Sequence, residues 1–83
     1  MEPHELHARV LGVCRQVLNV DDLEIDDEHA AADIPNYDSL AHIEILIRCQ
    51  QAFRITLSAL EAGQIANFGE LKDMVRRKVR ERA

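Results

Sequence analysis

Apolar side chains recur at helical spacing in the first part of the chain. They follow the i, i+4, i+7, i+11 pattern of an amphipathic helix, and two further residues widen the stripe. The members of the stripe are Leu6, Val10, Val13, Val17, Cys14 and Leu18. Pro3 suits the first turn of a helix, where its missing N–H group costs nothing. The pattern therefore predicts a first helix that begins near Pro3.

The helical pattern stops between Val20 and Asp38, where every charged side chain is acidic. This segment has no helical stripe and runs into Pro35, so it is predicted to be a long ordered loop. A loop of this length in a small domain is usually functional or disordered. Four apolar residues are expected to fix it to the core: Leu23, Ile25, Ile34 and Tyr37.

A second helix is predicted over residues 39–53, with Asp38 as the N-cap that accepts from N–H groups of the first turn. At 100° per residue its apolar side chains fall on two different faces. The expected core face consists of Ile45, Leu46, Cys49 and Phe53. The other stripe consists of Leu40, Ile43 and Ile47, bordered by Glu44, Arg48, Gln50 and Gln51. Such a stripe usually marks a docking surface when it is exposed, and the alternative is that the third helix or the long loop covers it.

Two capping patterns mark the remaining helices. Ser58 and Glu61 form an S-x-x-E capping box for a short third helix that ends near Ala66. Asn67 and Glu70 repeat the device for a last helix. The apolar residues of that helix are Leu71, Val75 and Val79. The chain is therefore predicted to be one all-α domain over residues 1–83, a small four-helix bundle without strands.

Composition narrows the possible functions. A chain of 83 residues buries only about 60–65% of its unfolded surface, which leaves little room for a deep substrate cleft. A net charge of −5 disfavours nucleic acid as the main partner. We expect no membrane partner and a cytoplasmic location, because no apolar run approaches the roughly 20 residues of a membrane span and no secretory signal is recognisable. Cys14 and Cys49 are expected to be reduced core thiols, and the basic residues from Lys72 onward to complement the end of a helix dipole.

Asp38, Ser39 and His42 suggest a catalytic triad, but the pattern is a poor one. Asp38 is needed as a cap, nothing orients the imidazole, and no glycine-rich elbow supplies an oxyanion hole. A calcium loop beginning at Asp22 fails because Asp27 stands where the sharp turn requires glycine. The four His residues have no metal-ligand spacing with the Cys residues. We therefore expect neither an enzyme nor a metal site.

A covalent modification is the better chemical interpretation of Ser39. A serine at the first helical position exposes its hydroxyl beside free backbone N–H groups and the positive end of the helix dipole. A phosphodiester attached there is electrostatically favoured.

The stretch "DSLAHIEIL" resembles the D-S-L motif at the start of the second helix of acyl carrier proteins. The resemblance extends over essentially the whole chain, through "QQAFRITL" and "IANFGELKDMV". It implies an acyl-carrier-type bundle with a long acidic loop after the first helix and a short third helix. It also implies that Ser39 carries 4′-phosphopantetheine, whose thiol holds acyl groups as thioesters.

The resemblance also implies partners and further site residues. The partners are a phosphopantetheinyl transferase, an acyl-loading enzyme, and a ketosynthase or other acyl-processing enzymes, served by a monomeric carrier. The partner-binding positions are Asp38, Leu40, Ile43, Glu44 and Ile47. His42, and Ile65 on the third helix, are expected to line the site of the arm and its cargo.

Several residues depart from the pattern of fatty-acid carriers. Tyr37 replaces the small residue that usually precedes the D-S-L motif. Ala41, Gln50 and Gln51 stand where acids are common, and Arg48 weakens the negative field further. These departures favour a stand-alone carrier for polyketide or related specialised biosynthesis. The alternatives are a housekeeping fatty-acid carrier, an aminoacyl or peptidyl carrier, and, from a different class, a helical adaptor without cofactor.

Overall fold

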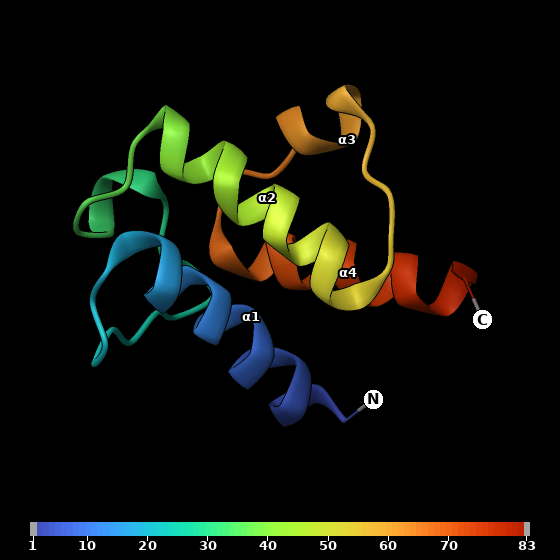
Figure 1. Ribbon diagram of the computed structural model, residues 1–83, viewed down its shortest axis with the longest axis horizontal. Helices are drawn as coiled ribbons and strands as arrows, with labels where there is room; N and C mark the ends of the chain where they lie inside the picture. Colours follow the sequence, from blue (N-terminus) through green and yellow to red (C-terminus); the bar gives the residue numbers. More distant parts are fainter. Residues whose placement is uncertain (1, 83) are drawn as a thin grey trace.

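The computed structural model describes residues 2–82 as an all-helical domain, with no strand in that range. Its elements are α1 (Pro3–Leu18), η1, a 3₁₀ helix (Ala31–Asp33), α2 (Ser39–Phe53), α3 (Ala59–Gly63) and α4 (Phe68–Arg82). The helices α1, α2 and α4 pack against one another, and α3 lies on the opposite side of α2 from α1 (Figure 1). No helix within this range is long and apolar enough to cross a membrane. The predicted all-α bundle is confirmed.

The core lies between α1, α2 and α4. On α2 the four predicted core residues, Ile45, Leu46, Cys49 and Phe53, are all buried. On α1 the buried face is rotated from the predicted stripe, because Leu11 is buried whereas Val13 and Val17 are only partly covered. The buried residues that α4 contributes to the core are Phe68, Leu71, Met74 and Val75.

The predicted caps are present, with two differences. The carboxylate of Asp38 accepts from the backbone N–H of Ala41 over 2.8 Å, and both bonds of the Ser58–Glu61 capping box are formed. However, α3 ends at Gly63 and not near Ala66, because the following N–H groups turn back to carbonyls three residues earlier. Ile65 therefore lies between α3 and α4, and not on the third helix as predicted.

The second difference concerns the start of α4. The side chain of Asn67 accepts from the N–H of Glu70 over 2.8 Å, as the capping pattern predicts. The carboxylate of Glu70 accepts from the N–H of Ala66 over 2.7 Å, whereas a standard capping box would bond the N–H of Asn67. The cap is thus displaced by one residue toward α3.

The acidic loop is ordered and attached to the helices at several points. Leu23 and Ile25 are buried, and Ile34 and Tyr37 pack against the core, as predicted. Asn36 takes the left-handed conformation, with φ of 63°, and its side-chain amide donates to the carbonyl of Leu18 over 3.1 Å.

The loop also caps α4 through its backbone. The N–H of Phe68 donates to the carbonyl of His29 over 3.0 Å, and the N–H of Gly69 donates to the carbonyl of Asp27 over 2.9 Å. A side chain at position 69 would meet the Cβ of Asp27 at 3.0 Å, so glycine permits this close approach. These bonds satisfy two N–H groups that a helix start leaves free.

A buried lysine reinforces the same contact. The ammonium of Lys72 lies 2.5 Å from a carboxylate oxygen of Asp27 and 3.0 Å from Nδ1 of His7. It also lies 5.3 Å from the centre of the Phe68 ring, a distance suited to a cation–π contact. Lys72 therefore joins α1, the acidic loop and α4 at one point.

Candidate functional site

Ser39 is the first residue of α2 and is exposed. Its neighbour Asp38 has an extended backbone and uses its carboxylate to cap the helix, so it does not contact the serine as a base. Within residues 2–82 the hydroxyl of Ser39 has no hydrogen-bond partner. The side chain is therefore open to a reagent from outside.

His42 does not activate Ser39. Its Nδ1 is hydrogen-bonded to the hydroxyl of Tyr37, and the two rings meet edge to face with centroids 5.8 Å apart. A general base must reach the hydroxyl whose proton it removes. Within residues 2–82 no hydrogen bond joins a base to the Ser39 hydroxyl.

A cavity of about 550 Å³ opens beside Ser39. Ser39 and Asp38 lie on its wall, together with the two predicted lining residues, His42 and Ile65. The apolar part of the wall consists of Cys14, Ile34, Ile43, Ile65, Ala66, Phe68 and Leu71. A group attached to Ser39 would therefore have an apolar space next to it.

Three polar residues of this wall were not predicted as site residues. They are His29 and Tyr37 from the acidic loop and Asn67 from the turn before α4. His29 and Asn67 lie far from Ser39 in the sequence, so no local pattern predicts that they share a cavity wall with it. The sequence indicates Tyr37 only as an anchor of the loop and as a departure from the fatty-acid pattern.

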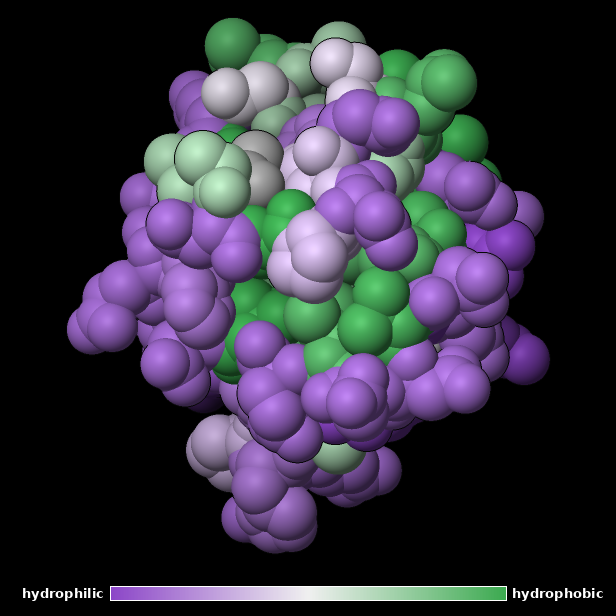
Figure 2. Space-filling view, turned by 90° about the vertical axis from the view of Figure 1, so that its left-hand side faces the viewer, coloured by the Kyte–Doolittle hydropathy of each residue, from purple (hydrophilic) through white to green (hydrophobic). Residues whose placement is uncertain are grey.

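The second apolar stripe of α2 is exposed. Leu40, Ile43 and Ile47 are 78%, 54% and 47% exposed, so neither α3 nor the loop covers them. Leu60 on α3, which the sequence did not single out, is 74% exposed. Figure 2 views the end of the molecule that contains the start of α2, and it shows hydrophobic atoms in the upper half and centre within a hydrophilic surround.

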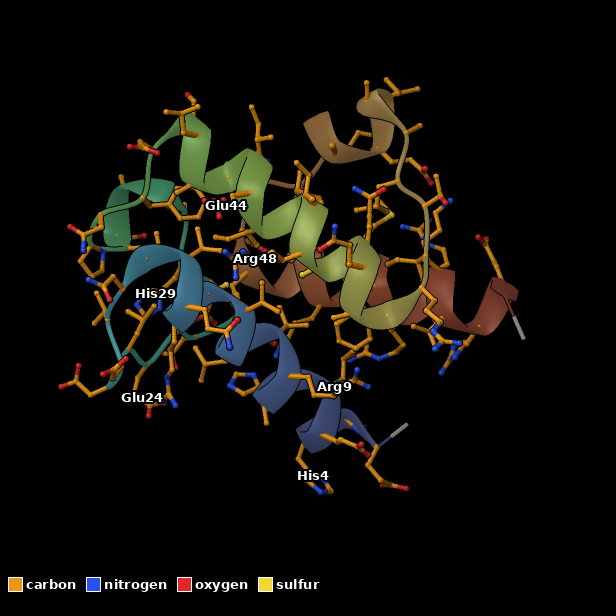
Figure 3. All side chains as sticks on the ribbon, viewed as in Figure 1. His4, Arg9, Glu24, His29, Glu44 and Arg48 are labelled. Carbon is orange, nitrogen blue, oxygen red and sulfur yellow. The ribbon has the colours of Figure 1, made fainter. Side chains whose placement is uncertain are left out.

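The charge beside this stripe is partly neutralised within α2. A carboxylate oxygen of Glu44 lies 2.9 Å from the guanidinium of Arg48, one turn further along the helix (Figure 3). Both side chains are about half exposed. The acid on the exposed stripe is therefore paired with a cation of the same helix.

The two cysteines are free and buried, as expected. Burial raises the pKa of both thiols to about 12, because desolvation disfavours the thiolate. A thiol with such a pKa is a weak nucleophile near neutral pH. Within the described residues, no three acidic, His or Cys side chains are grouped as metal ligands.

Comparisons with known proteins show a similarity to a solved structure. No protein-family model matches the sequence, and no curated protein matches it significantly. Among solved structures, the chain is similar to the solution NMR structure of a holo acyl carrier protein from Geobacter metallireducens, with 28% identity and a TM-score of 0.83. The match covers 93% of this chain and 87% of that chain. The two proteins therefore share the four-helix fold over nearly their whole length.

Proposed function

Since the chain is related to the acyl carrier protein family, we propose that it carries acyl groups as thioesters on 4′-phosphopantetheine attached to Oγ of Ser39. The observation that carries this proposal is the place of Ser39. Its hydroxyl is exposed, has no partner within residues 2–82, and stands at the first position of a well-capped helix beside a cavity.

The residues around Ser39 fit this group. The free N–H groups and the dipole at the start of α2 favour the negative charge of a phosphodiester. The apolar wall of the cavity suits an acyl chain, because burial removes its methylene groups from water. When bound, the cofactor supplies the thiol that forms the thioester.

The chain serves separate enzymes and is not an enzyme itself. No group of the described chain is placed to take the proton of Ser39, so the base comes from a phosphopantetheinyl transferase. Loading and processing of the acyl group belong to an acyl-loading enzyme and a ketosynthase or similar enzyme. We expect the carrier to meet them as a monomer in the cytoplasm.

Partner enzymes dock on the exposed stripe of α2. Leu40, Ile43 and Ile47 supply apolar area close to Ser39, and Asp38 and Glu44 supply acidic rim positions. Interfaces commonly combine such an apolar centre with a polar rim. A partner held there has the attachment point within the docked surface.

The carrier belongs to polyketide or related specialised biosynthesis. Arg48 pairs with Glu44, and uncharged Gln50 and Gln51 follow on the same helix, so the docking face is only weakly acidic. Tyr37, the bulky residue before the motif, reaches the cavity wall. Both features differ from the pattern expected of fatty-acid carriers.

The experiment is modification with a broad-specificity phosphopantetheinyl transferase and coenzyme A. Intact-mass measurement should show one added group on the wild type and none on Ser39→Ala. Native protein should then contain one thiol that iodoacetamide alkylates quickly, because Cys14 and Cys49, with pKa values of about 12, stay protonated and buried.

A known carrier, converted in parallel, controls for the activity of the transferase. A wild-type chain that stays unmodified under those conditions contradicts the proposal. The helical adaptor without cofactor, which would bind partners through α2 alone, would then be preferred.

A further inference from the structure

Two imidazole rings on the cavity wall have defined tautomers. The first is His42. The hydrogen bond between the Tyr37 hydroxyl and Nδ1 of His42 fits either tautomer, and the hydroxyl is assigned as the donor because it has no other partner within residues 2–82. Burial raises the pKa of Tyr37 to about 12, and the hydroxyl therefore keeps this proton near neutral pH. The neutral ring of His42 consequently carries its own proton on Nε2.

The second ring is His29, on the acidic loop. The backbone N–H of Asp26 donates to Nδ1 of His29 over 2.7 Å. A backbone N–H can only donate, so Nδ1 is the acceptor and the proton of the neutral ring lies on Nε2. The carbonyl of His29 accepts from the N–H of Phe68, which fixes this part of the loop to the start of α4.

Both Nε2–H groups are available to a ligand. Neither has a hydrogen-bond partner within the described part of the chain, and every fully buried side-chain nitrogen or oxygen there has one. The two groups are therefore reachable from the cavity or from water. Both residues are half-buried and line the cavity.

These donors change which acyl chain the cavity suits. A saturated chain would displace water from the two N–H groups and offer no acceptor in return, which is unfavourable. A keto or hydroxyl oxygen on the chain would accept a hydrogen bond from them. The same oxygen would be poorly placed against a wall made only of residues such as Ile34, Ile65 and Leu71.

We infer that this carrier shelters acyl chains bearing keto or hydroxyl oxygens in preference to saturated chains, with His42 and His29 as specificity-determining donors. Tyr37 is a positioning residue, since it holds His42 in the tautomer that donates toward the ligand. This inference rests on the proposed function, because the acyl chain reaches the cavity from Ser39. It names the class of cargo for that same site.

The test compares three chains of equal length on the wild-type carrier: hexanoyl, 3-hydroxyhexanoyl and 5-oxohexanoyl. Each is transferred to the protein from its coenzyme A thioester, and intact mass confirms loading. The rate of thioester exchange with excess 2-mercaptoethanol, which leaves keto and hydroxyl groups unchanged, is divided by the rate for the matching free acyl-pantetheine. Both oxygenated chains should be protected about twofold to tenfold more than hexanoyl, the usual net value of one neutral hydrogen bond.

Variants then test whether the preference for oxygenated chains depends on the rings of His42 and His29. His42→Phe and His29→Phe keep an aromatic ring but remove the donor, so each should reduce the preference, and the double variant should abolish it. His42→Gln retains an N–H donor and should keep part of it. His4→Phe is the matched control, because His4 is exposed at the other end of α1 from His29 (Figure 3).

The ¹⁵N shifts of the two imidazoles give a readout that a merely structural role would not move. In the wild type, Nε2 should shift with the oxygenated chains and not with hexanoyl. Equal protection of all three chains on the loaded wild type overturns this inference alone, and so does a preference that survives in a folded double variant. A wild-type protein that accepts none of the three acyl-pantetheine groups overturns the proposed function and this inference together.

Discussion

Ile47 and Cys49 lie two positions apart on α2 but in opposite environments, since Ile47 is 47% exposed and Cys49 is fully buried. Ile47→Ala should change the free energy of unfolding by no more than about 0.5 kcal/mol, the usual range for exposed truncations. It should lower kcat/KM of a partner enzyme by roughly fivefold or more if Ile47 is a centre of the docking surface. Urea denaturation and enzyme kinetics measure the two effects.

Cys49→Ala is the matched control within the same helix. It removes a buried sulfur and should lower the free energy of unfolding by roughly 1–2 kcal/mol. Should Ile47→Ala instead cost about 2 kcal/mol or more, its side chain belongs to the core and the docking interpretation of this residue is wrong.

At the scale of single elements, the proposed docking role of α2 predicts that its charge affects the choice of partner. Exposed charges act mainly on encounter rates and on the rejection of wrong partners. Arg48→Ala with Gln51→Glu frees Glu44 from its ion pair and adds an acid on the same helix. The double variant should be a better substrate for fatty-acid enzymes than the wild type, roughly threefold to tenfold in kcat/KM at low salt. Added salt should reduce the gain, because the Debye length falls to about 8 Å at physiological ionic strength.

The wild-type holo protein is used to test whether the chain has the specialised role at all. Elongation by a fatty-acid ketosynthase at the rate of that enzyme's own carrier would contradict the specialised role. Arg77→Ala with Arg80→Ala removes two exposed arginines of α4 and controls for the change in net charge, which is two units more negative in both double variants.

The sequence predicted α2 well because its signals are local. Asp38 caps its own helix within three residues, and the spacing of apolar side chains separates the core face from the exposed stripe. The end of α3 was predicted less well, since a helix of one turn has no periodic stripe, and the tightening after Gly63 depends on backbone geometry. The 3₁₀ helix η1 was not predicted for the same reason.

Contacts between distant residues could not be read from the sequence. Asp27 and Lys72 bind each other across the fold, and their separation in the chain offers no pattern that pairs them. No cavity was predicted from the sequence, and His42 and Ile65 were expected to line the site of the arm and its cargo only through the resemblance to carriers. Its polar members His29 and Asn67 depend on how the loop meets α4.

At the scale of the whole molecule, the contact between Asp27 and Lys72 fastens the loop to α4. The hydrogen bond with Lys72 lowers the pKa of Asp27, so the pair stabilises the fold fully above the ordinary aspartate pKa of about 3.9. The contribution is lost as pH falls through the lowered pKa. Asp27→Asn should therefore reduce the free energy of unfolding at pH 7 by roughly 1–3 kcal/mol, between the values of exposed and buried pairs.

Urea denaturation of both proteins from pH 7 downward checks this expectation. The difference between wild type and Asp27→Asn should shrink as the solution becomes acidic enough to protonate Asp27 in the folded state. Asp22→Asn is the control, because Asp22 is an exposed acid of the same loop with no ion pair within residues 2–82. A difference that is equal for both variants, or constant with pH, would show that the pair does not fasten the loop.

The bonds from Phe68 and Gly69 to the loop also separate two events in the life of a nascent chain. The proposed attachment point at Ser39 needs only the start of α2 and its cap, which form through contacts between residues close in the sequence. The wall of the cavity needs Phe68 and Leu71, which reach it only when the last helix has left the ribosome and closed onto the loop. A growing chain thus presents its serine before the cavity beside it has formed, and the closure of α4 onto the loop completes that cavity.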